Sequence, residues 1–237
     1  MNSRRPASFP QWLIHAAALI PLLWLITSLL LHGGGPNPIQ YLEKRSGDYA
    51  LVLLLASLAC TPLRLLSGYS QFTRFRRPLG LYAFAYAAVH FLLFIGLDYA
   101  FYWEELFRQF IEKTYLWFGL SALLILLVLA LTSTKRSQQV LKKNWQRLHT
   151  LVYLAGGLAV LHFALSVKGN IFLLRGEIFW PLLAILTLLL LLVIRLKPIQ
   201  RFIIRLRYQY TSTVSIIKIG FHRDGFNEKT VSEKPKK

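Results

Sequence analysis

The sequence predicts an all-α fold: a polytopic membrane bundle of six transmembrane helices, with the N and C termini both in the cytoplasm. Three observations lead to this class. The chain has 237 residues, of which 55% are hydrophobic. Leucine-rich runs recur along most of it, each near the roughly 20 residues that a helix needs to cross the hydrocarbon core. The basic residues flank these runs, mostly on one side.

The apolar runs divide the chain into a six-helix transmembrane domain, residues 1–200, and a basic cytoplasmic tail, residues 201–237. The predicted spans are 10–32, 47–66, 79–99, 115–133, 148–167 and 178–196. We expect the first span to stay uncleaved, because no A-x-A site stands before the polar loop G-G-G-P-N-P. No internal repeat is evident. A β-barrel would instead show alternating segments of about ten residues.

The distribution of charge predicts the orientation of the spans. Of the 28 Lys and Arg residues, all but six fall on one side. The exceptions are Lys44, Arg45, Arg108, Lys113, Lys168 and Arg175. Cytoplasmic loops carry an excess of Lys and Arg, so the basic side is cytoplasmic. The net charge of +18 therefore reflects topology and attraction to membrane lipid, and no nucleic-acid-binding motif accompanies it.

Two histidines deep in the predicted spans are candidate ligands for a haem iron. At 1.5 Å of rise per residue, His90 lies roughly 18 Å and His162 roughly 22 Å from the cytoplasmic ends of their spans. Neutral imidazole is a good axial ligand for haem, and rings at matched depth can hold one haem between them. By the same rise, His149 lies only about 3 Å deep and His15 about 8 Å deep.

Other interpretations stay open at this point. A buried histidine can bond a hydroxyl or carbonyl group of a neighbouring helix. It can relay protons in a transporter or channel, although Asp48 and Asp98 lie at the ends of the predicted spans. The bundle can also anchor another subunit without any redox role. The single cysteine, Cys60, excludes an internal disulfide and a multi-cysteine iron–sulfur centre.

Three segments of the sequence resemble the MsrQ (YedZ) family. They are R-R-P-L-G-L-Y-A-F-A-Y-A-A-V-H (76–90), L-A-L-T-S-T (129–134) and N-W-Q-R-L-H-T-L-V-Y-L-A-G-G-L-A-V-L-H (144–162). That family comprises the haem-binding membrane subunits of the bacterial periplasmic protein-methionine-sulfoxide reductase system, within the wider ferric-reductase-like transmembrane group. The resemblance covers residues 10–200, and the combined motifs with their spacing are specific.

The resemblance implies an electron-transfer subunit of the bacterial inner membrane rather than the catalytic reductase itself. The family carries haem b, often with an FMN, and takes electrons from the quinone pool. It passes them outward to a periplasmic molybdopterin subunit, its partner in a heterodimer, which reduces methionine sulfoxide in oxidised proteins. An alternative within the wider group is a transmembrane cytochrome b with another electron acceptor.

The resemblance also implies site residues. His90 and His162 match family haem ligands, and His149 matches the third family histidine. One haem is the main interpretation, and a second, inner haem on His149 with His15 stays open. Basic loop residues, including Arg77 and Arg147, are candidates to hold the FMN phosphate or to pair with propionates. The basic loops equally fit a solvated positive-inside surface.

Two segments carry less information. The outer loop 98–114 places aromatic residues beside acids, which fits either a docking surface for the periplasmic partner or an interfacial aromatic belt. The tail after residue 207 is longer than the family resemblance leads us to expect, and S-T-V-S-I-I-K-I (212–219) is a candidate strand. No G-x-G-x-x-G follows a predicted strand, so the sequence shows no attached dinucleotide-binding domain.

Overall fold

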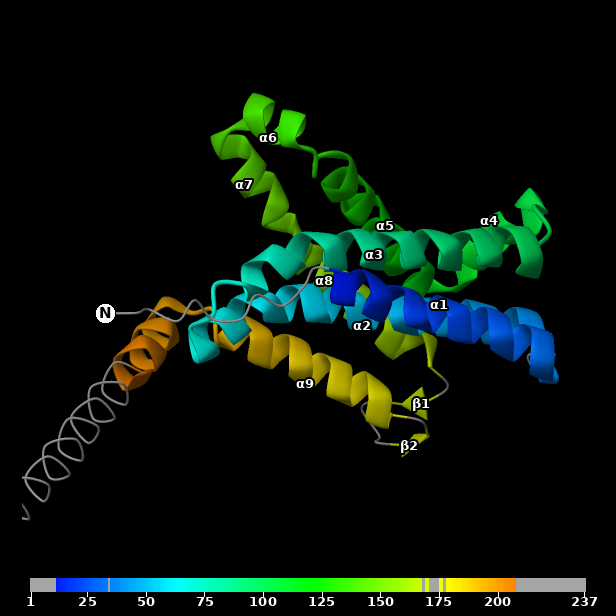
Figure 1. Ribbon diagram of the computed structural model, residues 1–237. Coiled ribbons are helices and arrows are strands. Elements are labelled where there is room, and N and C mark those ends of the chain that lie inside the picture. Colours follow the sequence, from blue (N-terminus) through cyan, green and yellow to red (C-terminus); the bar gives the residue numbers. More distant parts are fainter. Residues whose placement is uncertain (1–11, 34, 168, 171–174, 177, 208–237) are drawn as a thin grey trace, which may run out of the picture.

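The computed structural model describes residues 12–33, 35–167, 169–170, 175–176 and 178–207 (Figure 1). Nearly all of the described residues are helical, which confirms the predicted all-helical class. The strands among the described residues are only two residues long, β1 (Gly169–Asn170) and β2 (Arg175–Gly176), and pair antiparallel. The candidate strand 212–219, most of the tail and Arg4 and Arg5 lie outside the described residues.

The helices follow one another with short connections. Their bounds are α1 Trp12–His32, α2 Pro38–Ser67, α3 Phe72–Leu93, the π-helix η1 Phe94–Asp98, α4 Trp103–Glu112, α5 Thr114–Leu131, α6 Lys135–Leu141, α7 Lys143–His149, α8 Leu151–Ser166 and α9 Phe179–Val193. A further helix, Lys197–Arg207, is bent by 76° from α9. The boundary drawn at residue 200 falls inside this last helix.

Five of these helical segments are long and apolar enough to cross a membrane. They are α1, α2, α3 with η1, α5, and α7 with α8. The count rises to six only if α9 and the bent helix after it form one span. The chain is therefore a multi-pass membrane protein, and the sixth predicted span differs from the other five because it is broken.

Helix α2 begins earlier than the predicted span at residue 47. Asn37 caps it, with its side-chain oxygen accepting the backbone N–H of Gln40 at 3.1 Å, and Pro38 occupies the first helical position. These start signals lie in the G-G-G-P-N-P loop, outside the apolar run. The prediction that Asp48 stands at a span end was consequently wrong, because Asp48 lies in the third turn of a helix of 30 residues.

Helix α2 is the centre of the packing. It contacts α1, α3, α8 and α9, and Figure 1 shows α1 and α3 alongside it. Its Leu54 and Leu58 are each only 1% exposed. Two contacts hold it close to its neighbours. The hydroxyl of Ser57 donates to the carbonyl of Arg76 in α3 at 2.8 Å, and Gly156 in α8 leaves room for Leu58.

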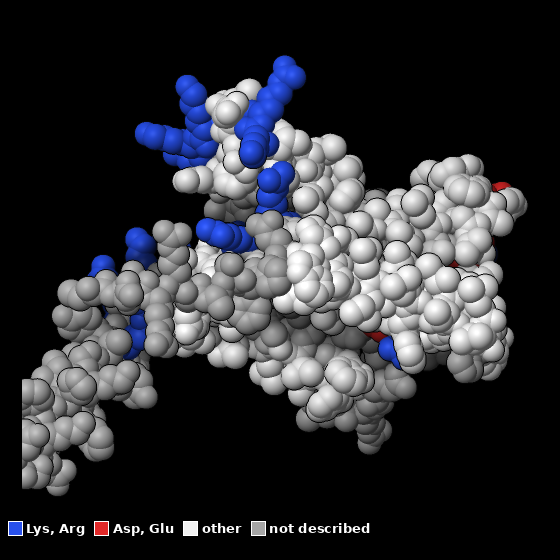
Figure 2. Space-filling view, in the orientation of Figure 1, with Lys and Arg blue, Asp and Glu red and all other residues white. Residues whose placement is uncertain are grey.

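Charges are segregated along the bundle (Figure 2). The acidic residues that the structure describes lie in the first half of α2, in η1 and in α4, which we call the acidic end. They are Glu43, Asp48, Asp98, Glu104, Glu105 and Glu112. Most described basic residues lie at the opposite, basic end. It comprises the last turn of α2, the first turns of α3, helices α6 and α7 and the segment after α9.

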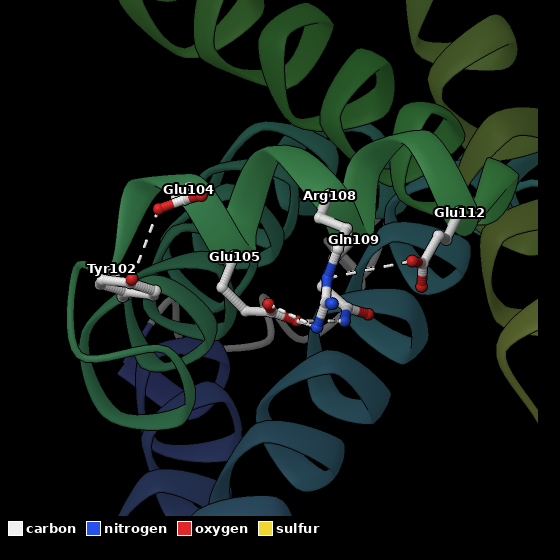
Figure 3. Close-up of polar contacts among 6 residues, drawn as sticks. All are labelled: Tyr102, Glu104, Glu105, Arg108, Gln109 and Glu112. Atoms are coloured by element: carbon white, nitrogen blue, oxygen red, sulfur yellow. Dashed lines mark hydrogen bonds and ion pairs between the residues drawn. The ribbon is translucent and has the colours of Figure 1, made fainter.

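Helix α4 was not predicted, because its segment was expected to be a loop. It is amphipathic: Leu106 is buried, whereas Phe107 and Ile111 are 69% and 82% exposed. On its polar face Arg108 bridges Glu105 at 2.6 Å and Glu112 at 3.9 Å (Figure 3). Hydrogen bonds from Arg108 and then Gln109 lower the pKa of the Glu105 carboxyl. This pattern is typical of a helix that lies at a membrane interface.

We predict that Asn37→Ala destabilises the protein by about 1 kcal/mol, because the first turn of α2 loses its side-chain acceptor. Thermal unfolding of the purified protein in detergent measures this loss as a lower melting temperature. Asn37→Asp is the matched control, since a carboxylate caps the same turn. Equal melting temperatures for the two variants would contradict the assignment of Asn37 as the cap.

Candidate functional site

The structure brings His90 of α3 and His162 of α8 together, although 72 residues separate them in the sequence. Their ring centroids lie 6.2 Å apart and the ring planes are inclined at 75°. Both rings lie nearer the acidic end than the basic end. We call these two side chains the histidine pair.

Each ring of the histidine pair is oriented by a backbone carbonyl. His90 Nδ1 lies 2.8 Å from the carbonyl oxygen of Glu43 in α2, and His162 Nδ1 lies 2.8 Å from that of Tyr115 in α5. A carbonyl oxygen only accepts, so Nδ1 carries the proton in both rings and Nε2 keeps its lone pair. Metal-binding histidines in proteins commonly have this second hydrogen bond, which fixes the tautomer and the ring orientation.

A glycine makes each of these close approaches possible. A Cβ atom at Gly47 would lie 3.1 Å from His90 Nδ1, and one at Gly119 would lie 2.7 Å from His162 Nδ1. Each glycine stands four residues after the residue whose carbonyl accepts the hydrogen bond. The side chain of any other residue would push the imidazole away from that carbonyl.

The two halves of the site repeat each other with an offset of 72 residues. The set Glu43, Gly47 and His90 corresponds to Tyr115, Gly119 and His162. The buried alanines Ala83 and Ala155, both with no exposed surface, obey the same offset. The sequence interpretation found no internal repeat, but the shared pattern A-x6-H-F at 83–91 and 155–163 was a usable signal.

His149 lies apart from the histidine pair, at the basic end. Its ring stacks on Trp145 with centroids 4.1 Å apart, and its Nε2 lies 3.3 Å from the hydroxyl of Thr132. By the offset of 72, its counterpart in the first half is Arg77. The first half of the repeat therefore has an arginine at the position where the second half has a histidine.

His15 has a third environment. Its Nδ1 is hydrogen-bonded to the hydroxyl of Tyr82 in α3 at 2.9 Å, and the two rings meet edge to face. Among the described residues, none of the ring contacts or hydrogen bonds joins His15 to His149. The two predicted ligands of a second haem, His15 and His149, are therefore not in direct contact with each other. His222 lies outside the described residues.

The candidate phosphate-binding arginines are exposed. Arg77 in the first turns of α3 and Arg147 in α7 both present their side chains at the surface of the basic end. Arg76, which precedes Arg77 in α3, is half-buried instead. It lies within electrostatic range of Cys60, His149 and Arg195. The sequence interpretation missed Arg195, because it lies 119 residues further along the chain.

A metal ion at the histidine pair would need ligands beyond those the described protein atoms supply. Within the described ranges, no cluster of three or more His, Cys, Asp or Glu side chains can hold a metal ion. The histidine pair would supply two nitrogen ligands, and a macrocycle such as haem brings the others itself. The donor set of this site therefore fits haem better than a bare ion.

Comparison with known proteins also points to haem. A family model described as "Ferric reductase like transmembrane component" matches residues 46–160. The protein-methionine-sulfoxide reductase heme-binding subunit MsrQ of Xanthomonas euvesicatoria pv. vesicatoria is 45% identical over 165 residues, 67% of this chain and 76% of that protein. The protein of the same name from Rhodospirillum rubrum is 41% identical over 189 residues, 79% of this chain and 88% of its own.

The chain belongs to the MsrQ family. The segment that matches the ferric-reductase-like model begins in α2 and ends two residues before His162. It contains Gly47 and His90 from the first half of the repeat and Tyr115 and Gly119 from the second, but neither Glu43 nor His162. The MsrQ relatives are named for haem binding, and in the described part of this chain the rings of His90 and His162 lie side by side.

We predict that Gly119→Ala destabilises the protein by about 1–3 kcal/mol, because the added methyl group would overlap the His162 ring. Thermal unfolding of haem-free protein in detergent measures this cost without reference to any cofactor. Gly157→Ala in α8 is the control, since its Cβ meets no atom within 4 Å and alanine favours a helix. A Gly119→Ala protein as stable as the control would contradict the close approach.

Proposed function

We propose that this chain is a membrane electron-transfer subunit that holds one b-type haem between His90 and His162. The observation that carries the proposal is the pair of facing imidazoles, each with Nδ1 bonded to a carbonyl and Nε2 left for a metal. Membership of a family whose relatives are named heme-binding subunits supports the same cofactor.

The ring centroids of His90 and His162 lie 6.2 Å apart, so the two side chains are near enough that both would hold one haem. Bound haem would supply one-electron chemistry. Held by two imidazoles, it would favour electron transfer over the binding of oxygen.

One haem fits this chain better than two. Haem-ligand histidines would have to face each other at both levels of the bundle to hold two. In the first half of the repeat the position that corresponds to His149 is Arg77, and an arginine remains protonated and cannot donate a lone pair to iron. His149 keeps a different role in this proposal, as a ring packed on Trp145 at the basic end.

The orientation follows from the charge. We infer that six spans cross the bacterial inner membrane, that the basic end and both termini are cytoplasmic, and that residues 201–237 are a cytoplasmic tail. The histidine pair then lies towards the periplasmic face. Arg77 and Arg147 contribute to the positive surface that attracts an anionic electron carrier such as FMN.

The direction of electron flow follows from this orientation and from the family. Electrons from the quinone pool, with FMN as an intermediate carrier, pass outward through the haem to a periplasmic molybdopterin-dependent methionine sulfoxide reductase. That partner is the catalytic subunit of the heterodimer and repairs oxidised proteins. The acidic polar face of α4 lies at the end of the bundle where such a partner would approach.

The matched family model favours a second candidate, a ferric-reductase-like cytochrome b that serves another acceptor. Oxidation of the haem in inner-membrane vesicles that have been reduced with quinol distinguishes the two candidate functions. Oxidation of the haem by the periplasmic reductase with methionine sulfoxide supports the first proposal. Oxidation by ferric citrate alone, with no response to the reductase, would favour the second.

We predict that His90→Ala or His162→Ala abolishes the b-type haem signal in a reduced-minus-oxidised spectrum, because each variant removes one axial ligand. His149→Ala is the matched control and should retain most of the signal. Immunoblots of the membrane fraction establish that each variant is inserted. Full haem content in both His90→Ala and His162→Ala would end the proposal for this ligand pair.

A further inference from the structure

Two half-buried arginines lie close together at the basic end, far from the histidine pair. Arg76 is in the second turn of α3, and Arg195 follows α9. Arg195 is held in place on two sides. Its Nη2 donates to the carbonyl oxygen of Leu58 at 2.6 Å, and its guanidinium lies 4.5 Å from the ring centre of Tyr153. The carbonyl oxygen of Arg76 accepts a hydrogen bond from Ser57, the residue before Leu58, so both arginines are attached to the same turn of α2.

No described acid balances this pair of positive charges. The acidic side chains that the structure describes lie at the acidic end, and the ion pairs they make are with Arg45 and Arg108. Arg195 Nε is also buried without an acceptor. Half-buried like charges repel each other and lose hydration, so their close placement costs free energy unless an anion joins them.

We propose that Arg76 and Arg195 form a binding site for a phosphate group. Guanidinium groups bind phosphate with paired hydrogen bonds, and two of them from different helices can clamp one phosphate. Either of two phosphate compounds fits this chemistry: the phosphomonoester of FMN or the phosphodiester of an anionic phospholipid. A haem propionate does not, because Arg76 stands 14 residues, roughly 21 Å of helix, from His90.

The proposal rests on the proposed function for its link to electron transfer. Arg77 takes the position in the first half of the repeat that His149 has in the second, so the basic end lacks a second pair of matching histidines among the described residues. An electron that enters there then needs a carrier other than a second haem. A flavin anchored by its phosphate at Arg76 and Arg195 would occupy that position. Phosphate binding itself is independent of this link and is tested separately.

Matched controls are present in the same elements. Arg74 lies two residues before Arg76 in α3, and Arg201 lies six residues after Arg195; both are exposed. Arg74→Gln and Arg201→Gln remove the same charge from the same end of the molecule. Any loss that depends only on the total positive charge must therefore appear in these controls too.

The experiment titrates FMN and riboflavin into the full chain in phosphatidylcholine nanodiscs and follows flavin fluorescence. For the double variant Arg76→Gln/Arg195→Gln, we expect FMN to bind at least tenfold more weakly. Riboflavin, which lacks the phosphate, should bind the variant and the wild type alike. The double control Arg74→Gln/Arg201→Gln should stay within twofold of wild type for FMN.

A second measurement tests whether the bound phosphate compound is a phospholipid rather than FMN. Native mass spectrometry of protein exchanged into phosphatidylglycerol counts retained lipid molecules. Loss of bound phosphatidylglycerol from the Arg76→Gln/Arg195→Gln variant, with unchanged FMN affinity, supports the site with lipid as its ligand. If neither FMN affinity nor lipid retention distinguishes this variant from the double control, the phosphate site is refuted.

The haem spectrum of the same samples keeps the two proposals apart. A variant with normal haem but weak FMN binding is folded and supports the phosphate site. If the Arg76→Gln/Arg195→Gln variant loses its haem, the variant Arg76→Lys/Arg195→Lys replaces it, because lysine keeps both positive charges. The phosphate site is then supported only if the Lys variant binds FMN more tightly than the Gln variant. Wild-type protein that binds FMN through these arginines but never binds haem would refute the proposed function and leave the phosphate site supported.

Discussion

Two hydrogen bonds determine how this bundle can present its imidazoles. In each, a histidine Nδ1 reaches the backbone carbonyl of a neighbouring helix at 2.8 Å, inside a span where no water competes for the acceptor. The carbonyl belongs to a regular helix and is reachable only because a glycine stands four residues later. Close packing of α2 on α3 and of α5 on α8 is therefore a condition of the site, and the orientation of both rings is settled before any cofactor binds.

The repeat is the basis for proposing one haem rather than two. Near the acidic end both halves carry the same elements, a carbonyl, a glycine and a histidine, so the rings meet. Near the basic end the halves have diverged, with His149 in one and Arg77 in the other. Beside this divergence lie Arg76 and Arg195, which create a positive environment suited to an anion. Under the two proposals above, the ends of the bundle serve different chemistry, a metal at one and a phosphate at the other.

The segregation of charge gives this arrangement a direction. Glu43 lies beside the histidine pair, Asp98 and the acidic side chains of α4 lie at the same end of the bundle, and the basic helices α6 and α7 lie at the far end (Figure 2). In a membrane this asymmetry both selects the orientation and attracts different partners to the two faces. The exposed pairs of Arg108 with Glu105 and Glu112 contribute little to stability, but they organise the polar face of α4.

The sequence by itself determined the membrane class, most of the spans and the two candidate ligand histidines. These follow from quantities that act along the chain: apolar length, charge on each flank, and depth counted at a fixed rise per residue. It did not reveal the early start of α2, because the Asn37 cap lies outside the apolar run, nor the helix in 103–112. Only the tertiary structure decided which carbonyls orient the rings and which arginines meet, because Arg76 and Arg195, like His90 and Glu43, become neighbours through helix packing that no local pattern encodes.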